Sequence, residues 1–225
     1  MTLDAPCLKE IADALKPHGI LLRGVINLGS GQGPKLNQGG YAASVVLLGN
    51  VGGSIWPSFS RWRQDYLGHH PLDTWSRECI EPVAATVGAT AVFPWDRPYQ
   101  PFQRWAMQAE GLKPSPLGIL IHPSYGLWHG YRGALAFAQE FDPIPVERRP
   151  HPCRLCAEKP CLTACPAHAV MPTVFSVEGC HKYLQTEAAR PGCMTHGCAA
   201  RNACPIGAAY RYPSEQIVFH MAALA

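Results

Sequence analysis

The 225-residue sequence lacks any run of about 18 apolar residues, the length that a membrane-spanning helix requires. Charged residues are scarce at 16% of the chain, and the formal net charge is only +3. Because proteins that bind nucleic acid usually carry a basic stripe, we expect no nucleic-acid partner, and we expect no membrane partner either. No apolar signal segment follows residues 1–4, and we therefore expect a cytoplasmic protein.

Cysteine, in contrast, is abundant, and eight of the ten cysteines fall within residues 153–204. They form two series, each ending in Cys-Pro: Cys153, Cys156, Cys161 and Cys165, then Cys180, Cys193, Cys198 and Cys204. Thiolates grouped in fours can hold an iron–sulfur cluster, and in the two-cluster bacterial pattern the last cysteine of a run ligates the other cluster. The stretch therefore predicts two [4Fe-4S] clusters.

Three other roles for these cysteines stay open. A disulfide framework needs an oxidising compartment, which the missing signal segment argues against. Two zinc sites are chemically feasible, although only Cys153 and Cys156 form the Cys-x2-Cys knuckle that zinc ribbons usually pair. Unligated core cysteines would be unusual at this density.

The cysteine-rich stretch resembles bacterial-type two-cluster ferredoxins and, more closely, the ferredoxin-like part of epoxyqueuosine reductases and reductive dehalogenases. In those proteins a compact first motif precedes a lone cysteine in a Cys-x-x-Tyr-Leu setting, which residues 180–184 match. The resemblance implies crossed ligation, with one cluster on Cys153, Cys156, Cys161 and Cys204 and the other on Cys165, Cys180, Cys193 and Cys198. The spacers before Cys161, Cys198 and Cys204 are longer here than in those families.

A second motif occupies residues 122–133 and reads His-Pro-Ser-Tyr-Gly-Leu-Trp-His-Gly-Tyr-Arg-Gly. The residues alone indicate a glycine-rich loop between two strands, in which glycines permit close backbone approach to a ligand. Arg132 offers a planar fork for a carboxylate, phosphate or amide oxygen. A tight structural turn with Arg132 in a surface ion pair is the alternative.

This motif resembles the signature of the cblC-type cobalamin-processing chaperones, which bind cobalamin and remove its upper axial ligand. It is also similar to a glycine-rich segment of the epoxyqueuosine reductases and dehalogenases. The resemblance implies a cobalamin site whose cofactor-binding residues are His122, Tyr125, Gly126, Trp128 and Arg132. In the chaperones the arginine at this position helps to hold glutathione, so a small-molecule thiol such as glutathione is an expected partner.

Two further likenesses point to a catalytic aspartate and to a helix start. Residues 93–96 resemble the strand that carries the reductases' catalytic aspartate, which makes Asp96 and Arg132 the candidate catalytic pair. A capping role for Asp96 before Pro98 is the alternative. Residues 70–73 resemble the Asp-Pro-x-Asp helix start of the chaperones.

Hydrophobic periodicity predicts an α+β protein. Helical spacing predicts helices at residues 6–16, 74–87 and 102–109. Apolar runs predict strands at residues 20–28, 90–93, 117–121 and 134–141, and a strand or buried helix at 41–49. We therefore predict a nitroreductase-like domain over residues 1–145 and a double [4Fe-4S] ferredoxin-like domain over residues 146–225, which ends in a helix capped by Ser214. Prolines at 143, 145, 150 and 152 predict a stiff connector.

These motifs predict an iron–sulfur oxidoreductase that passes electrons from two [4Fe-4S] clusters to a cobalamin in the N-terminal domain. One alternative is a ferredoxin-type electron carrier with no corrinoid, whose N-terminal domain docks a partner, and another is a flavin-dependent reductase. The expected donor is a reduced ferredoxin, flavodoxin or reductase. A cluster of basic residues lies just before and within the first cysteine series: Arg148, Arg149, His151, Arg154 and Lys159. It is either a docking patch for an acidic electron donor or a solvated linker.

Overall fold

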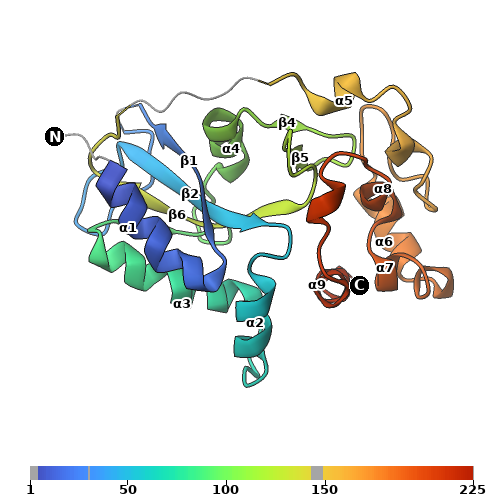
Figure 1. The fold of residues 1–225 in the computed structure, drawn as a ribbon, viewed down its shortest axis with the longest axis horizontal. Coiled ribbons are helices and arrows are strands. Elements are labelled where there is room, and N and C mark those ends of the chain that lie inside the picture. The colour runs from blue at the N-terminus through green and yellow to red at the C-terminus, as the bar shows by residue number, and fades with distance from the viewer. Residues whose placement is uncertain (1–4, 30, 143–148, 225) are drawn as a thin grey trace. The chain divides into compact units, whose positions relative to one another are not determined.

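The computed structural model describes residues 5–29, 31–142 and 149–224 (Figure 1). The chain divides into two compact units, one made of residues 1–111 and 130–148 and the other of residues 112–129 and 149–225. The predicted boundary at residue 145 lies outside the described residues, as do Pro143, Pro145 and Arg148 of the predicted connector and basic cluster. Residues 112–129 differ from the prediction, because the structure groups them with the cysteines rather than with the N-terminal residues.

A four-stranded sheet organises the first unit, with strand order β1-β2-β6-β3. Its strands are β1 (Leu21–Asn27), β2 (Ser44–Val51), β3 (Thr90–Val92) and β6 (His129–Phe137). β1 pairs antiparallel with β2, and β3 pairs antiparallel with β6. Seven consecutive residues of β2 are buried, as expected for a strand covered on both faces. The ambiguous run at residues 41–49 is thus a strand, and the strand predicted at 134–141 begins at His129, so it includes Arg132.

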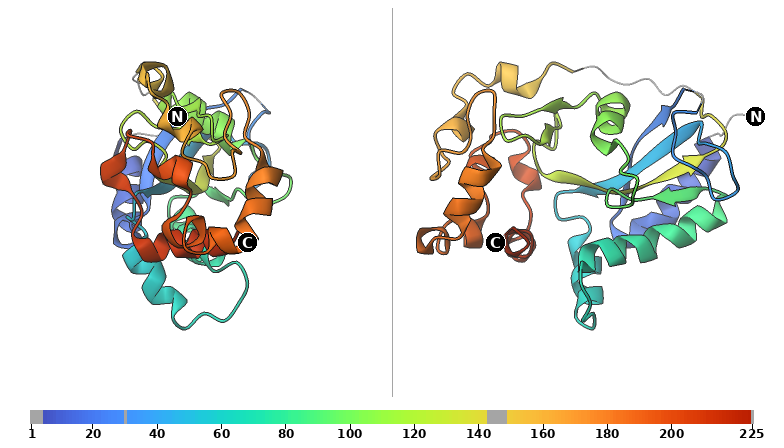
Figure 2. Two further views of the ribbon diagram at one scale, coloured as in Figure 1. Left: turned by 90° about the vertical axis from the view of Figure 1, so that its right-hand side faces the viewer. Right: turned by 180° about the vertical axis from the view of Figure 1, so that it is seen from behind.

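The described residues of the first unit also form the α-helices α1 (Ala5–Leu15), α2 (Trp56–Arg63), α3 (Pro71–Thr86) and α4 (Phe102–Glu110). Figures 1 and 2 show α1 and α3 on one face of the sheet and α4 on the other. The helices predicted at residues 6–16, 74–87 and 102–109 are confirmed. α3 begins earlier than predicted because a proline occupies its first turn, where its fixed φ suits a helix start.

Short elements make up the second unit. A two-stranded sheet pairs β4 (Lys113–Pro114) with β5 (Leu120–Ile121). The helices are α5 (Pro152–Leu155), α6 (Val177–Leu184), α7 (Cys193–His196), α8 (Ala199–Asn202) and α9 (Ser214–Ala222). The predicted C-terminal helix is therefore present, but Ser214 is its first residue and not its cap: the cap position is Pro213, which offers no side-chain hydrogen bond.

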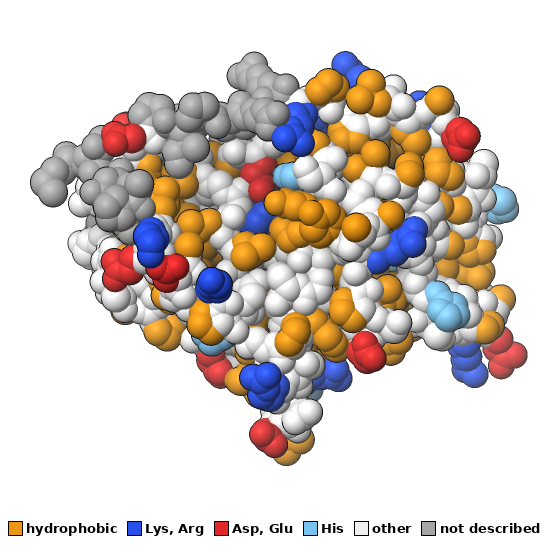
Figure 3. Space-filling view, in the orientation of Figure 1, with side chains coloured by type: hydrophobic (Ala, Val, Ile, Leu, Met, Phe, Trp, Pro, Cys, Tyr) orange, Lys and Arg blue, Asp and Glu red, His pale blue; other side chains and the backbone are white. Residues whose placement is uncertain are grey.

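Within the described residues, no helix is long and apolar enough to cross a membrane. The secondary structure confirms the predicted α+β class. Charged side chains are sparse over the face shown in Figure 3, in keeping with their 16% share of the sequence.

Candidate functional site

The structure brings the eight predicted ligands together as two groups of four. The pKa of the Cys153 thiol is raised to about 11, first by burial and then by the neighbouring thiols of Cys204, Cys161 and Cys156. Cys204, which lies far along the chain from the other three, thus belongs to this first cysteine group: Cys153, Cys156, Cys161 and Cys204. This is one of the two sets that crossed ligation requires.

The second cysteine group consists of Cys165, Cys180, Cys193 and Cys198. Burial raises the pKa of the Cys180 thiol, and the neighbouring thiols of Cys198, Cys165 and Cys193 add to that rise. Cys198 likewise has Cys193 and Cys165 as its neighbouring thiols. Each of these electrostatic effects joins two members of the same set that the ferredoxin resemblance implies, while one apolar core packs against cysteines of both sets.

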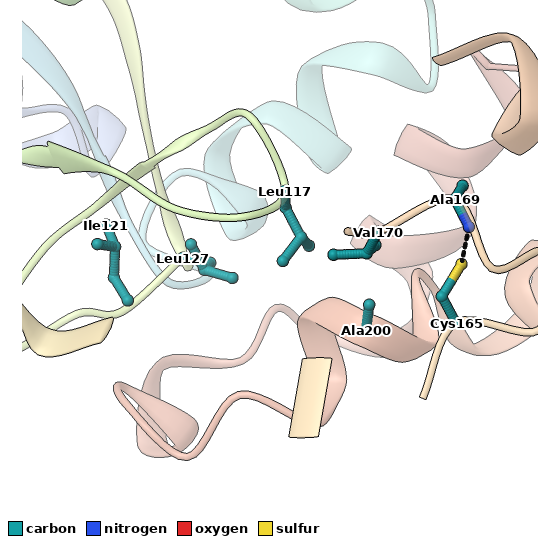
Figure 4. Close-up of a cluster of buried hydrophobic side chains, with 7 residues drawn as sticks. All are labelled: Leu117, Ile121, Leu127, Cys165, Ala169, Val170 and Ala200. Atoms are coloured by element: carbon teal, nitrogen blue, oxygen red, sulfur yellow. Dashed lines mark hydrogen bonds between the residues drawn. The ribbon is translucent and has the colours of Figure 1, made fainter. Parts of the chain in front are cut away.

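Backbone N–H groups point at sulfur in both groups. The N–H of Ala169 donates to Cys165 Sγ at 3.4 Å, as drawn in Figure 4. Hydrogen bonds from the N–H groups of Arg201 and Ala200 lower the pKa of Cys198, against the larger effect of burial. A hydrogen bond from the backbone N–H of Ile206 likewise lowers the pKa of Cys204, against the larger effect of burial. Such bonds favour the thiolate and are among the features that tune the potential of a bound cluster.

The first group also surrounds a cavity. All four of its cysteines line one small cavity of about 20 Å³. Pro116 and Ile121 of the β4–β5 hairpin complete its wall. Four cysteines in one wall match the ligand type of iron–sulfur clusters, which is chiefly the cysteine thiolate.

Two findings bear on the alternative roles of the cysteines. All ten are free thiols, so the structure contains no disulfide framework among the described residues. In the same part of the chain, no group of three or more His, Cys, Asp or Glu side chains could hold a metal ion. A four-iron cluster separates its thiolates more widely than a single ion does.

The cysteine groups pack against the β4–β5 hairpin and the turn that follows it. Figure 4 shows this core, in which hairpin and turn residues meet residues from the cysteine series: Leu117, Ile121, Leu127, Cys165, Ala169, Val170 and Ala200. This shared core explains why residues 112–129 group with the cysteines.

The predicted cofactor-binding residues His122, Tyr125 and Gly126 form a self-bonded turn in the second unit. His122 and Gly126 exchange two backbone hydrogen bonds of 2.9 Å, and His122 Nδ1 accepts from the N–H of Tyr125 at 3.1 Å. The His122 and Tyr125 rings stack with their centroids 4.1 Å apart. Gly126 has a φ of +58°, and a Cβ there would lie 1.9 Å from the carbonyl oxygen of Ile206. The close backbone approach predicted at this glycine is therefore made to the loop that follows Cys204.

Trp128 is 1% exposed and lies in the core of the same unit. The guanidinium of Arg201 lies 4.2 Å from the centre of the Trp128 ring and 4.7 Å from that of Tyr212. Arg201 also donates to the carbonyl oxygen of Leu127 at 2.5 Å. Because Arg201 lies between Cys198 and Cys204, this stacking ties the tryptophan to the second cysteine series.

Asp96 and Arg132, the predicted catalytic pair, lie in the first unit, and each interacts with a residue in the wall of one hollow of about 400 Å³. The hollow is lined by His69, His70, Asp73, Thr74, Arg77 and Trp95. Asp96 Oδ1 accepts from Arg77 Nη2 at 2.5 Å. Burial raises the pKa of Asp73, and the charges of Arg132 and His70 oppose that rise. Each predicted residue thus contacts, or acts electrostatically on, a residue of the wall.

The hollow adds Asp73 and Arg77 to the predicted pair. Asp73 lies within the helix start that the sequence resemblance singled out, but it had no assigned role. Arg77 follows four residues later, on the same side of α3, and could have been found from that spacing. Its guanidinium also lies over the Phe93 ring, 4.3 Å from the ring centre.

A buried ionic group in the first unit escaped the sequence analysis. Arg23 Nε and Nη2 donate to the two carboxylate oxygens of Glu110 at 2.9 and 3.1 Å, and Arg23 Nη1 donates to the carbonyl oxygen of Asn50 at 3.0 Å. The Tyr131 hydroxyl donates to the same carboxylate. Burial raises the pKa of Glu110, against the lowering effects of Arg23 and Tyr131. The group joins α4 to strands β1 and β6.

Comparisons with known proteins agree on the fold. No protein-family model matches the sequence, and no curated protein matches it. Among solved structures, the chain is similar to a B12-trafficking protein, CblC, of C. elegans, a homologue of human MMACHC. The TM-score is 0.53 at 12% identity, over 97% of this chain and 92% of that one.

It is also similar to an epoxyqueuosine reductase solved with an epoxyqueuosine-modified tRNA-Tyr stem loop. Here the TM-score is 0.50 at 15% identity, over 79% of this chain. The match covers 52% of the reductase, so the likeness extends over about half of that protein's length. The chain therefore has a mixed α+β fold that resembles CblC and part of an epoxyqueuosine reductase.

Proposed function

We propose that the protein is an iron–sulfur oxidoreductase that passes electrons from two [4Fe-4S] clusters to a corrinoid bound by the first unit. The arrangement of eight cysteines as two groups of four carries the proposal. The first cysteine group would hold one cluster and the second group the other. When bound, such clusters supply single electrons at potentials set by burial and by hydrogen bonds to sulfur. The similarity to a B12-trafficking protein supports a corrinoid as the acceptor.

The hollow beside Asp96 and Arg132 supports a second component, a small anionic thiol of the glutathione kind. Arg77 supplies positive charge in its wall, Arg132 acts electrostatically on Asp73 of that wall, and His69 and His70 supply further hydrogen-bonding groups. Asp73 is the half-buried carboxyl of the wall, and its raised pKa favours holding a proton there. Asp96 is paired with Arg77, so it would position that guanidinium rather than release a proton itself.

Anaerobic purification followed by iron, sulfide and cobalt analysis tests the first step of this function. Protein that carries clusters should then shift the visible spectrum of added cob(II)alamin toward the base-off form, and Arg132→Ala should weaken the shift. Reversible cluster reduction with no shift at saturating protein would reject the corrinoid and favour the ferredoxin-type carrier. Extracted FMN would favour the flavin-dependent reductase instead.

Paired cysteine substitutions test the grouping. Cys153→Ser should remove about half of the bound iron, because one of two equal clusters loses a ligand. Adding Cys204→Ser should remove little more, since both residues belong to the first group. Adding Cys193→Ser to Cys153→Ser should instead remove nearly all the iron. Equal losses from the two double variants would reject the crossed grouping.

A further inference from the structure

The surface beside the first cysteine group combines positive charge with exposed apolar side chains. Arg149, Arg154 and Lys159 are exposed there, and Leu155 at the end of α5 is 73% exposed. Figure 3 shows hydrophobic and basic side chains together over α5. Arginine is enriched in protein contact surfaces, and here Leu155 adds an exposed apolar side chain beside it.

Two hollows connect these side chains directly to the cysteines. One, of about 440 Å³, has Arg154, Lys159 and Cys153 in its wall. The other, of about 350 Å³, has Arg149, Leu155 and Cys156. Val174, which is 51% exposed, adds an apolar edge to the first hollow. A molecule seated on this face would therefore approach the sulfur atoms of the first group closely.

The second cysteine group has different surroundings. Cys165 and Cys193 are buried, and the packing around Cys193 includes Leu184 and Met221. Residues 176–198 contain two basic and two acidic side chains, whereas residues 149–161 contain three basic and one acidic. The first group therefore has both an excess of positive charge beside it and cysteines that line surface hollows.

We propose that this face is the docking surface for a small acidic redox protein, and that electrons enter through the first cysteine group. The proposal rests on the proposed function, because it needs a cluster on Cys153, Cys156, Cys161 and Cys204. A cluster held by these four cysteines would accept the one electron that the donor loses, with no bond formed or broken and no proton transferred. Charge complementarity selects the occupant: basic side chains around an apolar centre steer an acidic partner and fix its register.

Arg154→Glu tests the charge, and Arg190→Glu is its matched control. Arg190 is also exposed and lies three residues from Cys193 of the second group, so both variants change the net charge equally. The probe is an acidic plant-type ferredoxin, and the readout is the second-order rate constant of electron exchange in whichever direction the potentials permit. At low salt, Arg154→Glu should lower this rate constant about ten-fold and flatten its dependence on ionic strength. Arg190→Glu should leave both close to wild type.

Leu155→Ser tests the apolar centre separately. This variant should slow exchange at every salt concentration without changing the ionic-strength dependence, because it removes contact area and no charge. Iron content and reduction by dithionite are measured for every variant. Suppose that iron content is normal, and that Arg154→Glu leaves the exchange rate unchanged or changes it no more than Arg190→Glu does. That result would overturn the docking surface alone. Iron-free wild-type protein would overturn the proposed function and this proposal with it.

Discussion

The two units are built on different physical principles. The first buries large apolar side chains around a sheet, among them Leu47, Phe59 and Trp75, and its longest helix has 16 residues. The second has two small cores rich in alanine and cysteine, and three of its helices have four residues each. Small cores and single-turn helices supply little stability of their own. If the proposed clusters are bound, cross-linking through the cysteine groups would stabilise the second unit, whereas the first unit has a large apolar core of its own.

Removal of iron should reveal the largest difference in stability between the two units. Metal binding and folding are coupled wherever the site does not exist in the unfolded chain, so chelation should unfold the second unit almost completely. Limited proteolysis should then cut within residues 149–224, while residues 5–111 stay protected. Visible absorbance reports the iron in the same samples.

The same experiment can contradict the expected difference in stability between the two units. Protection of both units after complete loss of iron would show that the second unit is stable through its own packing. Cleavage spread evenly over the chain would show that the first unit depends on the clusters as well.

Arg23→Met should produce the next largest effect, confined to the first unit. It leaves the Glu110 carboxylate buried without its cation, and breaking such a pair costs about 3–5 kcal/mol of unfolding free energy near neutral pH. Chemical denaturation followed by tryptophan fluorescence measures this, because five of the six tryptophans lie in the first unit. Iron content should not change.

The pH dependence of Arg23→Met has a definite sign. Burial raises the pKa of Glu110 in the folded protein and Arg23 lowers it, so the substitution raises that pKa further. A carboxyl whose folded-state pKa lies above its ordinary value near 4.5 favours folding at lower pH, and this contribution is lost as pH rises through the folded-state value. The variant should therefore regain stability on acidification toward pH 4.5.

The exposed pair of Lys9 and Asp13 supplies the control. Because solvent screens an exposed pair, Lys9→Met should leave the stability of the first unit close to wild type. An Arg23→Met variant as stable as Lys9→Met would mean that the buried group contributes nothing.

Local sequence patterns identified much of the first unit and less of the second. Helical spacing located α1, α3 and α4, and the apolar run located β2. Helical spacing did not reveal α2, because Phe59 is the only buried residue of that helix and a single buried residue makes no apolar stripe. The ionic pair of Arg23 and Glu110 joins residues 87 positions apart, so no local signal announces it.

The candidate site divides in the same way. The ferredoxin resemblance implied the division into two groups of four, and the ligand role of these cysteines stays a prediction. Spacing alone could not assign Cys204 to the first group, because it lies far along the chain from the other three. The partners of the second motif could not be predicted, since they come from the far end of the chain: Arg201 for Trp128 and Ile206 for Gly126. The hollow of the first unit likewise joins the start of α3 to Trp95, in the turn after β3, which only the fold brings together.

Gly126→Ala should have a smaller effect than Arg23→Met, and its effect should fall on the second unit. The new Cβ would meet the backbone of Ile206, and the positive φ of +58° adds strain, so we expect a loss of about 3 kcal/mol. Because Ile206 follows Cys204 closely, the variant should also lose iron faster under chelation.

Gly88→Ala is the matched control in the first unit. Gly88 also has a positive φ, +65°, but a Cβ there meets nothing within 4 Å. It should cost only the backbone strain, about 1 kcal/mol, with no change in the rate of iron loss. Equal costs for the two alanines would mean that the turn at residues 122–128 can move away from the Cys204 loop without loss. Faster iron loss in Gly126→Ala alone would instead show that this glycine contact helps to hold the first cysteine group in place.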